Sequence, residues 1–304
     1  MKNPPLILLF SIFYIDNDLL FLYNRIGEVE RRTIYMKKNL TFEGEYLEQI
    51  RNLTLMDDNF MTICFDGFIE GAELVLSTIL ERADLSVVSV NTQVRITSFE
   101  NRSVWLDILA VDQDHKLYNI EIQQADGGAD FKRARYHSSV LDSRYLMKGE
   151  SFSELPETYV IFITKNDVIG EDKPIYYVER IILNCDKTFD DEEHIIYVNG
   201  AYRDDTTDFG KLMHDFFSAD PNDMNYDVLA DKIRYYKENE EGIRKMSSVF
   251  EEVKNKGREE GREEGREEGL IMAYLQEEIS REAVMRLLKI SDDEFDVLVS
   301  FYNQ

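Results

Sequence analysis

Cysteine is scarce in this sequence, and acidic residues far outnumber basic ones. The chain of 304 residues has two cysteines, Cys64 and Cys185, which lie far apart and lack the spacing of metal ligands. This argues against a disulfide framework or a cysteine-based zinc site and favours a reducing cytoplasm. Lys and Arg number 35 against 60 Asp and Glu, a formal net charge of −25. General affinity for nucleic acids is not expected, so binding DNA would require a local basic patch, a bound divalent cation, or both.

Several catalytic signatures are missing too. The chain has no glycine-rich phosphate loop, no G-x-S-x-G motif and no Ser/His/Asp grouping. Its histidines show no metal-binding spacing and are expected to be structural or exposed; they are His115, His137, His194 and His214. Apolar residues, in contrast, make up 43% of the chain. A substantial core is therefore expected, in one large domain or two ordinary ones.

The first 35 residues read differently from the rest. Two apolar runs, residues 6–13 and 19–23, are separated by two aspartates that would be costly in the middle of a membrane span. The codons of Arg31 and Arg32 can form a bacterial ribosome-binding sequence shortly before Met36. We therefore expect residues 1–35 to be translated leader of weak order, and a membrane anchor is the alternative.

Hydrophobic periodicity predicts an α/β fold. The polar turn at residues 112–116 makes the two strands that flank it a probable hairpin. The predicted helices are residues 58–82 and about 129–147, and residues 209–256 are predicted to be helical throughout. The predicted strands are residues 86–97, 103–111, 117–123, 158–164, 175–183 and 194–202.

The C-terminal part contains a repeat. "GREEGREEGREEG", residues 257–269, is expected to be a solvated linker, because each glycine weakens a helix by about 1 kcal/mol. Residues 270–304 are predicted to form short helices with Ser280 and Ser291 as N-caps. This tail carries more apolar surface than a small helical piece hides alone, so we expect it to dock on a partner or on a second copy.

The stretch "YNIEIQQAD", residues 118–126, alternates between apolar and polar residues. In a strand, Glu121 and Gln123 would project from one face, about 6–7 Å apart. Asp107 is the one acid in the otherwise apolar neighbouring strand. A buried carboxylate is costly unless it is paired or binds a metal. Two carboxylates from adjacent strands are typical of an Mg²⁺ site, and Mn²⁺ is an alternative ion.

Such a site would suit phosphodiester hydrolysis, with the metal activating water and stabilising charge on the phosphate. Gln123 would orient the attacking water, and Lys132, Arg133 and Arg135 would contact DNA phosphates. Glu73 is a candidate third ligand, or else a salt-bridge partner of Arg133 or Arg135. The alternative is that the acids are surface residues or salt-bridge partners without a catalytic role.

Five blocks of the sequence carry a family resemblance: "FDGFIEGAELVLSTIL", "SVWLDILAVDQDHKLYNIEIQQAD", "KRARYHSSVLDS", "LPETYVIFITKNDV" and "IIYVNGAYRDD" followed by "GKLMHDF". In this order they resemble the PD-(D/E)XK nuclease family transposases, also called recombination-promoting nucleases. The resemblance implies a restriction-endonuclease-like core and an Mg²⁺-dependent DNA endonuclease linked to recombination or mobile elements. Asp107 and Glu121 match the acidic pair, and Gln123 stands where the superfamily pattern has Lys.

The sequence thus predicts a cytoplasmic endonuclease without a membrane segment. Residues 36–256 would form the nuclease-like domain with a helical extension, residues 257–269 a linker, and residues 270–304 a tail through which the chain forms homo-oligomers. The rival hypothesis is a non-catalytic protein, descended from nucleases, that binds DNA structures or other proteins. Divalent-metal binding separates the two, because the rival needs none.

Overall fold

The computed structural model describes residues 46–96 and 103–302. The expected leader, residues 1–35, lies outside the described residues. All the strands and the helices α2–α9 belong to the unit Gln49–Gln304.

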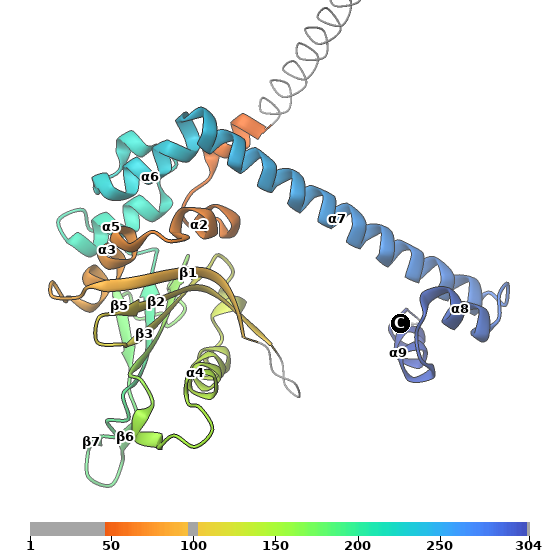
Figure 1. Ribbon diagram of the computed structural model, residues 1–304, viewed down its shortest axis with the longest axis horizontal. Helices are drawn as coiled ribbons and strands as arrows, with labels where there is room; N and C mark the ends of the chain where they lie inside the picture. The colour runs from red at the N-terminus through yellow and green to blue at the C-terminus, as the bar shows by residue number, and fades with distance from the viewer. Residues whose placement is uncertain (1–45, 97–102, 303–304) are drawn as a thin grey trace, which may run out of the picture. The chain divides into compact units, whose positions relative to one another are not determined.

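A six-stranded mixed sheet is the centre of the fold, in the order β1-β2-β3-β4-β8-β5 (Figure 1). β1, β2 and β3 are antiparallel, β3, β4 and β8 are parallel, and β5 returns antiparallel at the edge. The predicted hairpin is confirmed, because β2 and β3 pair across the turn. The strands are β1 Val87–Ile96, β2 Val104–Asp112, β3 Leu117–Gln123, β4 Thr158–Thr164, β5 Ile175–Val178 and β8 Glu193–Asn199, with β6 Ile181–Ile182 and β7 Lys187–Thr188 forming a separate ribbon.

Helices lie on both faces of this sheet. α2 (Asp58–Phe65) and α3 (Ile69–Leu80) cover one face, and α4 (Phe131–Tyr145) covers the other (Figure 1). The prediction of one helix over residues 58–82 was wrong. Gly67 takes a left-handed φ of +64°, a conformation that glycine adopts without penalty, and it breaks the helix in two. The predicted α/β fold itself is confirmed.

The remaining helices follow β8: α5 (Asp208–Phe217), α6 (Asp227–Glu238) and α7 (Glu240–Leu275). Residues 257–269 lie inside α7 and are helical throughout. The helix is anchored on both sides of the glycine repeat, since Met246 and Ile271 are fully buried. Extending a formed helix costs far less than nucleating one, and i,i+4 ion pairs such as Lys256–Glu260 add support. The domain boundaries at this repeat remain a prediction.

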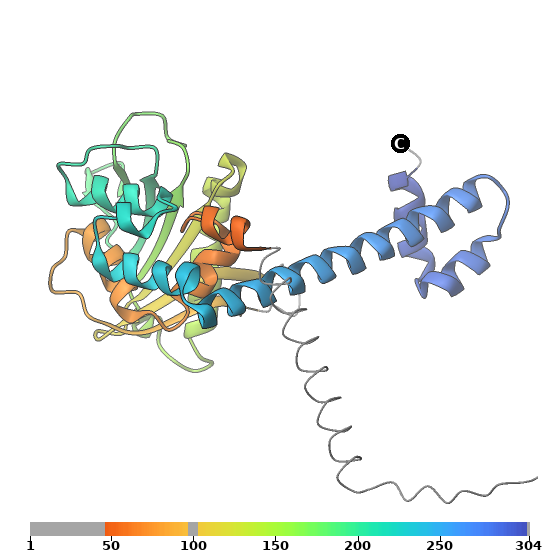
Figure 2. The same cartoon turned by 90° about the horizontal axis from the view of Figure 1, so that it is seen from above.

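The tail forms a small core of its own. α8 (Arg281–Leu288) and α9 (Asp292–Tyr302) pack on the last turns of α7 (Figure 2), where Ile271, Val284 and Phe295 are buried together. Both predicted N-caps are confirmed, because the hydroxyls of Ser280 and Ser291 accept backbone hydrogen bonds from Ala283 and Glu294. Most apolar tail residues therefore pack within the tail, and the expected self-association remains a prediction.

Among residues 46–96 and 103–302, no helix is both long enough and apolar enough to cross a membrane.

Candidate active site

The strands β2 and β3 separate at the point where the predicted site lies. Their backbone pairing ends at Ile108 and Ile120, whereas β1 pairs with β2 as far as Val104 and β3 pairs with β4 as far as Gln123. Beyond this point, two side chains form the hydrogen bonds between β2 and β3. Asp107 Oδ2 accepts the Ile122 N–H at 3.0 Å, and Glu121 Oε1 accepts the Asp107 N–H at 3.3 Å. We call this point of separation the fork. It brings the two predicted carboxylates together inside the sheet.

Both carboxylates are removed from water. Asp107 is 8% exposed and Glu121 is fully buried. Burial, together with the negative charge of Glu121, raises the pKa of Asp107 to about 7. Asp58 makes a third, smaller contribution to this rise. Burial and two neighbouring acids therefore favour the neutral form of Asp107 when no cation is bound.

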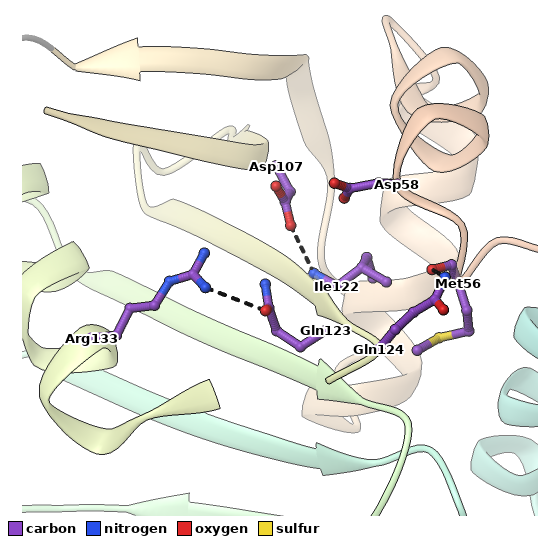
Figure 3. Close-up of a pocket in the computed structure, with 7 residues that line it drawn as sticks. All are labelled: Met56, Asp58, Asp107, Ile122, Gln123, Gln124 and Arg133. Atoms are coloured by element: carbon purple, nitrogen blue, oxygen red, sulfur yellow. Dashed lines mark hydrogen bonds between the residues drawn. The ribbon is translucent and has the colours of Figure 1, made fainter. Parts of the chain in front are cut away.

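An open pocket of about 390 Å³ gives access to the fork. Asp58, from the first turn of α2, and Asp107, from β2, point into it from neighbouring walls, as Figure 3 shows. Burial and the charge of Glu121 raise the pKa of Asp58 as well. Asp58 is thus the third acid of the site. Sequence reasoning missed it, because an Asp at a helix start is usually a simple capping residue.

Gln123 and Arg133 form the other wall of the pocket (Figure 3). Arg133 reaches over from α4 and donates to Gln123 Oε1 at 3.3 Å, to the Gly128 carbonyl at 2.9 Å and to Glu121 Oε2 at 3.1 Å. A Cβ atom at Gly128 would lie only 1.9 Å from Gln123 Oε1, so any other residue there would displace the end of the Gln123 side chain. The amide of Gln123 is consequently held beside a guanidinium group.

His137 is buried behind this wall, one helical turn after Arg133 on α4. Its Nε2 accepts from Arg133 Nε at 3.3 Å, so in the neutral ring Nδ1 carries the hydrogen. That nitrogen lies 3.3 Å from Glu121 Oε1 and 3.2 Å from the side-chain amide of Asn119. His137 therefore orients Glu121 and Arg133. Residues four apart share a helix face, and this spacing was the available signal for the pair.

The other predicted residues lie farther from the fork. Lys132 and Arg135 are exposed on α4, on either side of Arg133. Glu73 does not line the pocket, and its carboxylate accepts the backbone N–H of Val87 at 2.8 Å, at the start of β1. Asp58 rather than Glu73 is therefore the acid beside Asp107.

A hard divalent cation fits this donor set. Among the residues that the structure describes, no group of three His, Cys, Asp or Glu side chains is close enough to hold a metal by itself. Mg²⁺ does not need one, because it binds through one or two carboxylates and keeps several waters. Burial, and after it the charge of Glu121, raises the pKa of Asp107, and a bound cation would favour its ionised form.

A six-stranded mixed sheet flanked by helices is consistent with the PD-(D/E)XK nuclease fold. The chain belongs to the family described as PD-(D/E)XK nuclease family transposase, whose model matches residues 75–271. The family supports a nuclease role associated with recombination, and its superfamily generally uses divalent metals. No curated protein and no solved structure matches the chain significantly.

Proposed function

We propose that the protein is an Mg²⁺- or Mn²⁺-dependent DNA endonuclease that hydrolyses phosphodiester bonds. The observation that carries this proposal is the pair Asp107 and Glu121, held side by side where β2 and β3 separate and next to an open pocket. A purely structural buried acid would be expected to find enough hydrogen-bond donors to keep its pKa low. Asp107 accepts one backbone hydrogen bond and has its pKa raised instead.

Asp107 and Glu121 would hold the metal ion, and Asp58 lines the same pocket as a further oxygen donor. The bound ion would activate water and neutralise charge on the scissile phosphate. Gln123 would orient the attacking water through its amide. His137 would help to keep Glu121 in place, because its Nδ1 lies 3.3 Å from Glu121 Oε1. Lys132 and Arg135, exposed on α4, would contact phosphates of the DNA.

Arg133 supplies the positive charge that Gln123 lacks. Glutamine can only form hydrogen bonds, whereas the Lys of the superfamily pattern also carries charge. The Arg133 guanidinium donates to the Gln123 amide, so its charge lies beside the position that the ammonium group of a Lys would occupy. We therefore assign charge stabilisation to Arg133 and water orientation to Gln123.

The test is a plasmid-nicking assay on the purified protein with Mg²⁺, with Mn²⁺ and with EDTA. We expect supercoiled plasmid to become nicked or linear with either ion and to stay intact in EDTA. Equal cleavage in EDTA would contradict a metal-dependent mechanism, and no cleavage under any condition would contradict nuclease activity.

One observation favours the alternative, a non-catalytic protein that binds DNA structures or other proteins. Glu121 is already paired with Arg133 at 3.1 Å, as expected for an acid with a structural role. Titration calorimetry with Mn²⁺ separates the two hypotheses. The nuclease requires metal binding that Asp107→Asn weakens, whereas the alternative predicts no binding in either protein.

A further inference from the structure

A second groove adjoins the pocket at the fork. It encloses about 820 Å³, and Arg133 lines both cavities. Its walls come from the start of β2 and from α4, and they include Trp105, Lys132 and Tyr136. A ligand in this groove would therefore reach the candidate active site at Arg133.

Trp105 is the unusual residue of this groove. It is the single tryptophan of the chain, stands two residues before Asp107 on β2 and is 52% exposed. Arg95 is its partner across the β1–β2 ladder, and the Arg95 guanidinium lies 5.6 Å from the centre of the indole ring. This cation–π contact steadies the ring and places a positive charge beside it. An ordered aromatic surface thus faces solvent next to the site.

The charge of the groove is opposite to that of the chain. Lys132 and Arg133 line it and Arg95 lies beside it, in a protein whose net charge is −25. Among the described residues that line the groove, the acid is Asp130, which accepts the backbone N–H groups of Lys132 and Arg133 as the N-cap of α4. An aromatic surface flanked by Lys and Arg is the combination that binds single-stranded nucleic acids.

We propose that this groove binds an unpaired nucleobase of the DNA substrate, stacked on Trp105, with the adjoining phosphates at Arg95 and Lys132. Stacking requires a free base face, and in a duplex the neighbouring base pairs cover both faces. The inference rests on the proposed function and narrows it. The substrate class is single-stranded DNA, or duplex DNA with an unpaired stretch next to the cleavage position.

The single tryptophan makes the groove directly observable. Full-length protein in EDTA is titrated with oligothymidylate and with an abasic oligomer that has the same length and the same phosphates. We expect oligothymidylate to quench the fluorescence and to bind about 5- to 150-fold more tightly than the abasic oligomer, the range typical of one stacked base. Equal affinities for the two oligomers would overturn the proposal, because phosphate contacts alone would then explain binding.

Variants make the assignment specific. In anisotropy titrations with labelled oligomers, Trp105→Ala should lose the preference for oligothymidylate, and Trp105→Phe should keep part of it. Phe189→Ala is the matched control, because Phe189 is 56% exposed and lies outside both cavities. A tryptophan signal that changes with protein concentration in the absence of DNA would also refute the proposal, since a second copy would then cover the ring.

Different experiments can refute the groove proposal and the nuclease proposal. Binding in EDTA requires no hydrolysis, so the preference for bases tests the groove alone, whereas plasmid nicking tests the nuclease alone. A protein that nicks plasmid but binds both oligomers equally retains the proposed function and refutes the groove.

Discussion

Replacing Asp107 by Asn should stabilise the metal-free protein at pH 8. Burial and the charge of Glu121 raise the pKa of Asp107 from 3.8 to about 7. One pKa unit corresponds to about 1.4 kcal/mol, so an ionised Asp107 costs the native state about 4 kcal/mol at this pH. Asn has nearly the same shape, and its Oδ1 can still accept the Ile122 N–H. We expect a gain of about 2–4 kcal/mol in the free energy of unfolding.

The stability gained by replacing Asp107 with Asn should be larger at high pH than at low pH. The pKa in the native state lies above the unfolded value of 3.8, so wild-type stability is lost as pH rises from about 4 to about 7. At pH 5.5, which is above the sequence pI of about 4.5, the advantage of Asn should be about 2 kcal/mol smaller than at pH 8. Urea unfolding in EDTA at the two pH values measures this difference.

Asp112→Asn is the matched control, on the same strand. Asp112 is also buried, but its carboxylate accepts from the backbone of Asp114 and Lys116 and from the Tyr118 hydroxyl. Its replacement should destabilise the protein by about 1–2 kcal/mol. If Asp107→Asn destabilises the metal-free protein at pH 8 as this control does, Asp107 is a structural residue and our reasoning is wrong.

Three further results are expected. Mg²⁺ needs an ionised Asp107, so its apparent affinity should fall up to tenfold per pH unit below about 7 in calorimetry, and a flat profile would contradict this. Gln123→Lys alone would place the new ammonium group about 3–4 Å from the Arg133 guanidinium, and the two cations would repel each other. Single-turnover cleavage should therefore be faster in the double variant Gln123→Lys, Arg133→Gln than in the single variant Gln123→Lys. Equal rates would show that Arg133 does not interact with position 123. Deleting residues 257–304 should change the free energy of unfolding of the core by less than about 1 kcal/mol, because residues 251–266 are exposed. The same deletion should lower the mass measured by light scattering if the tail self-associates.

Strand periodicity was enough to predict the pair at the fork. Glu121 and Gln123 alternate with apolar residues, and Asp107 is the only charge in an apolar stretch of β2. The bounds of β3 and β4 agree with the prediction, because β3 alternates apolar with polar residues after a polar turn and β4 is a continuous run of β-branched and aromatic residues. The local pattern of polar and apolar residues therefore predicted which strands carry the two acids.

Contacts between distant segments could not be predicted in the same way. Asp58 reaches the site from a helix that lies 49 positions before Asp107 in the sequence, so only the packing of α2 on the sheet reveals it. His137 was expected to be structural or exposed, and its contact with Glu121 depends on how α4 lies across β3. The helical state of residues 257–269 depends on the buried flanks of α7, which outweigh the low propensity of glycine.

Metal-dependent cleavage by Asp107→Asn tests the central claim most directly. Asp114→Asn, the same substitution in the exposed turn between β2 and β3, is the control. In single-turnover plasmid cleavage with Mg²⁺ at pH 8, the control should match the wild type, whereas Asp107→Asn should be slower by orders of magnitude while remaining folded. Cleavage by Asp107→Asn at the wild-type rate would contradict a metal site at the β2–β3 fork.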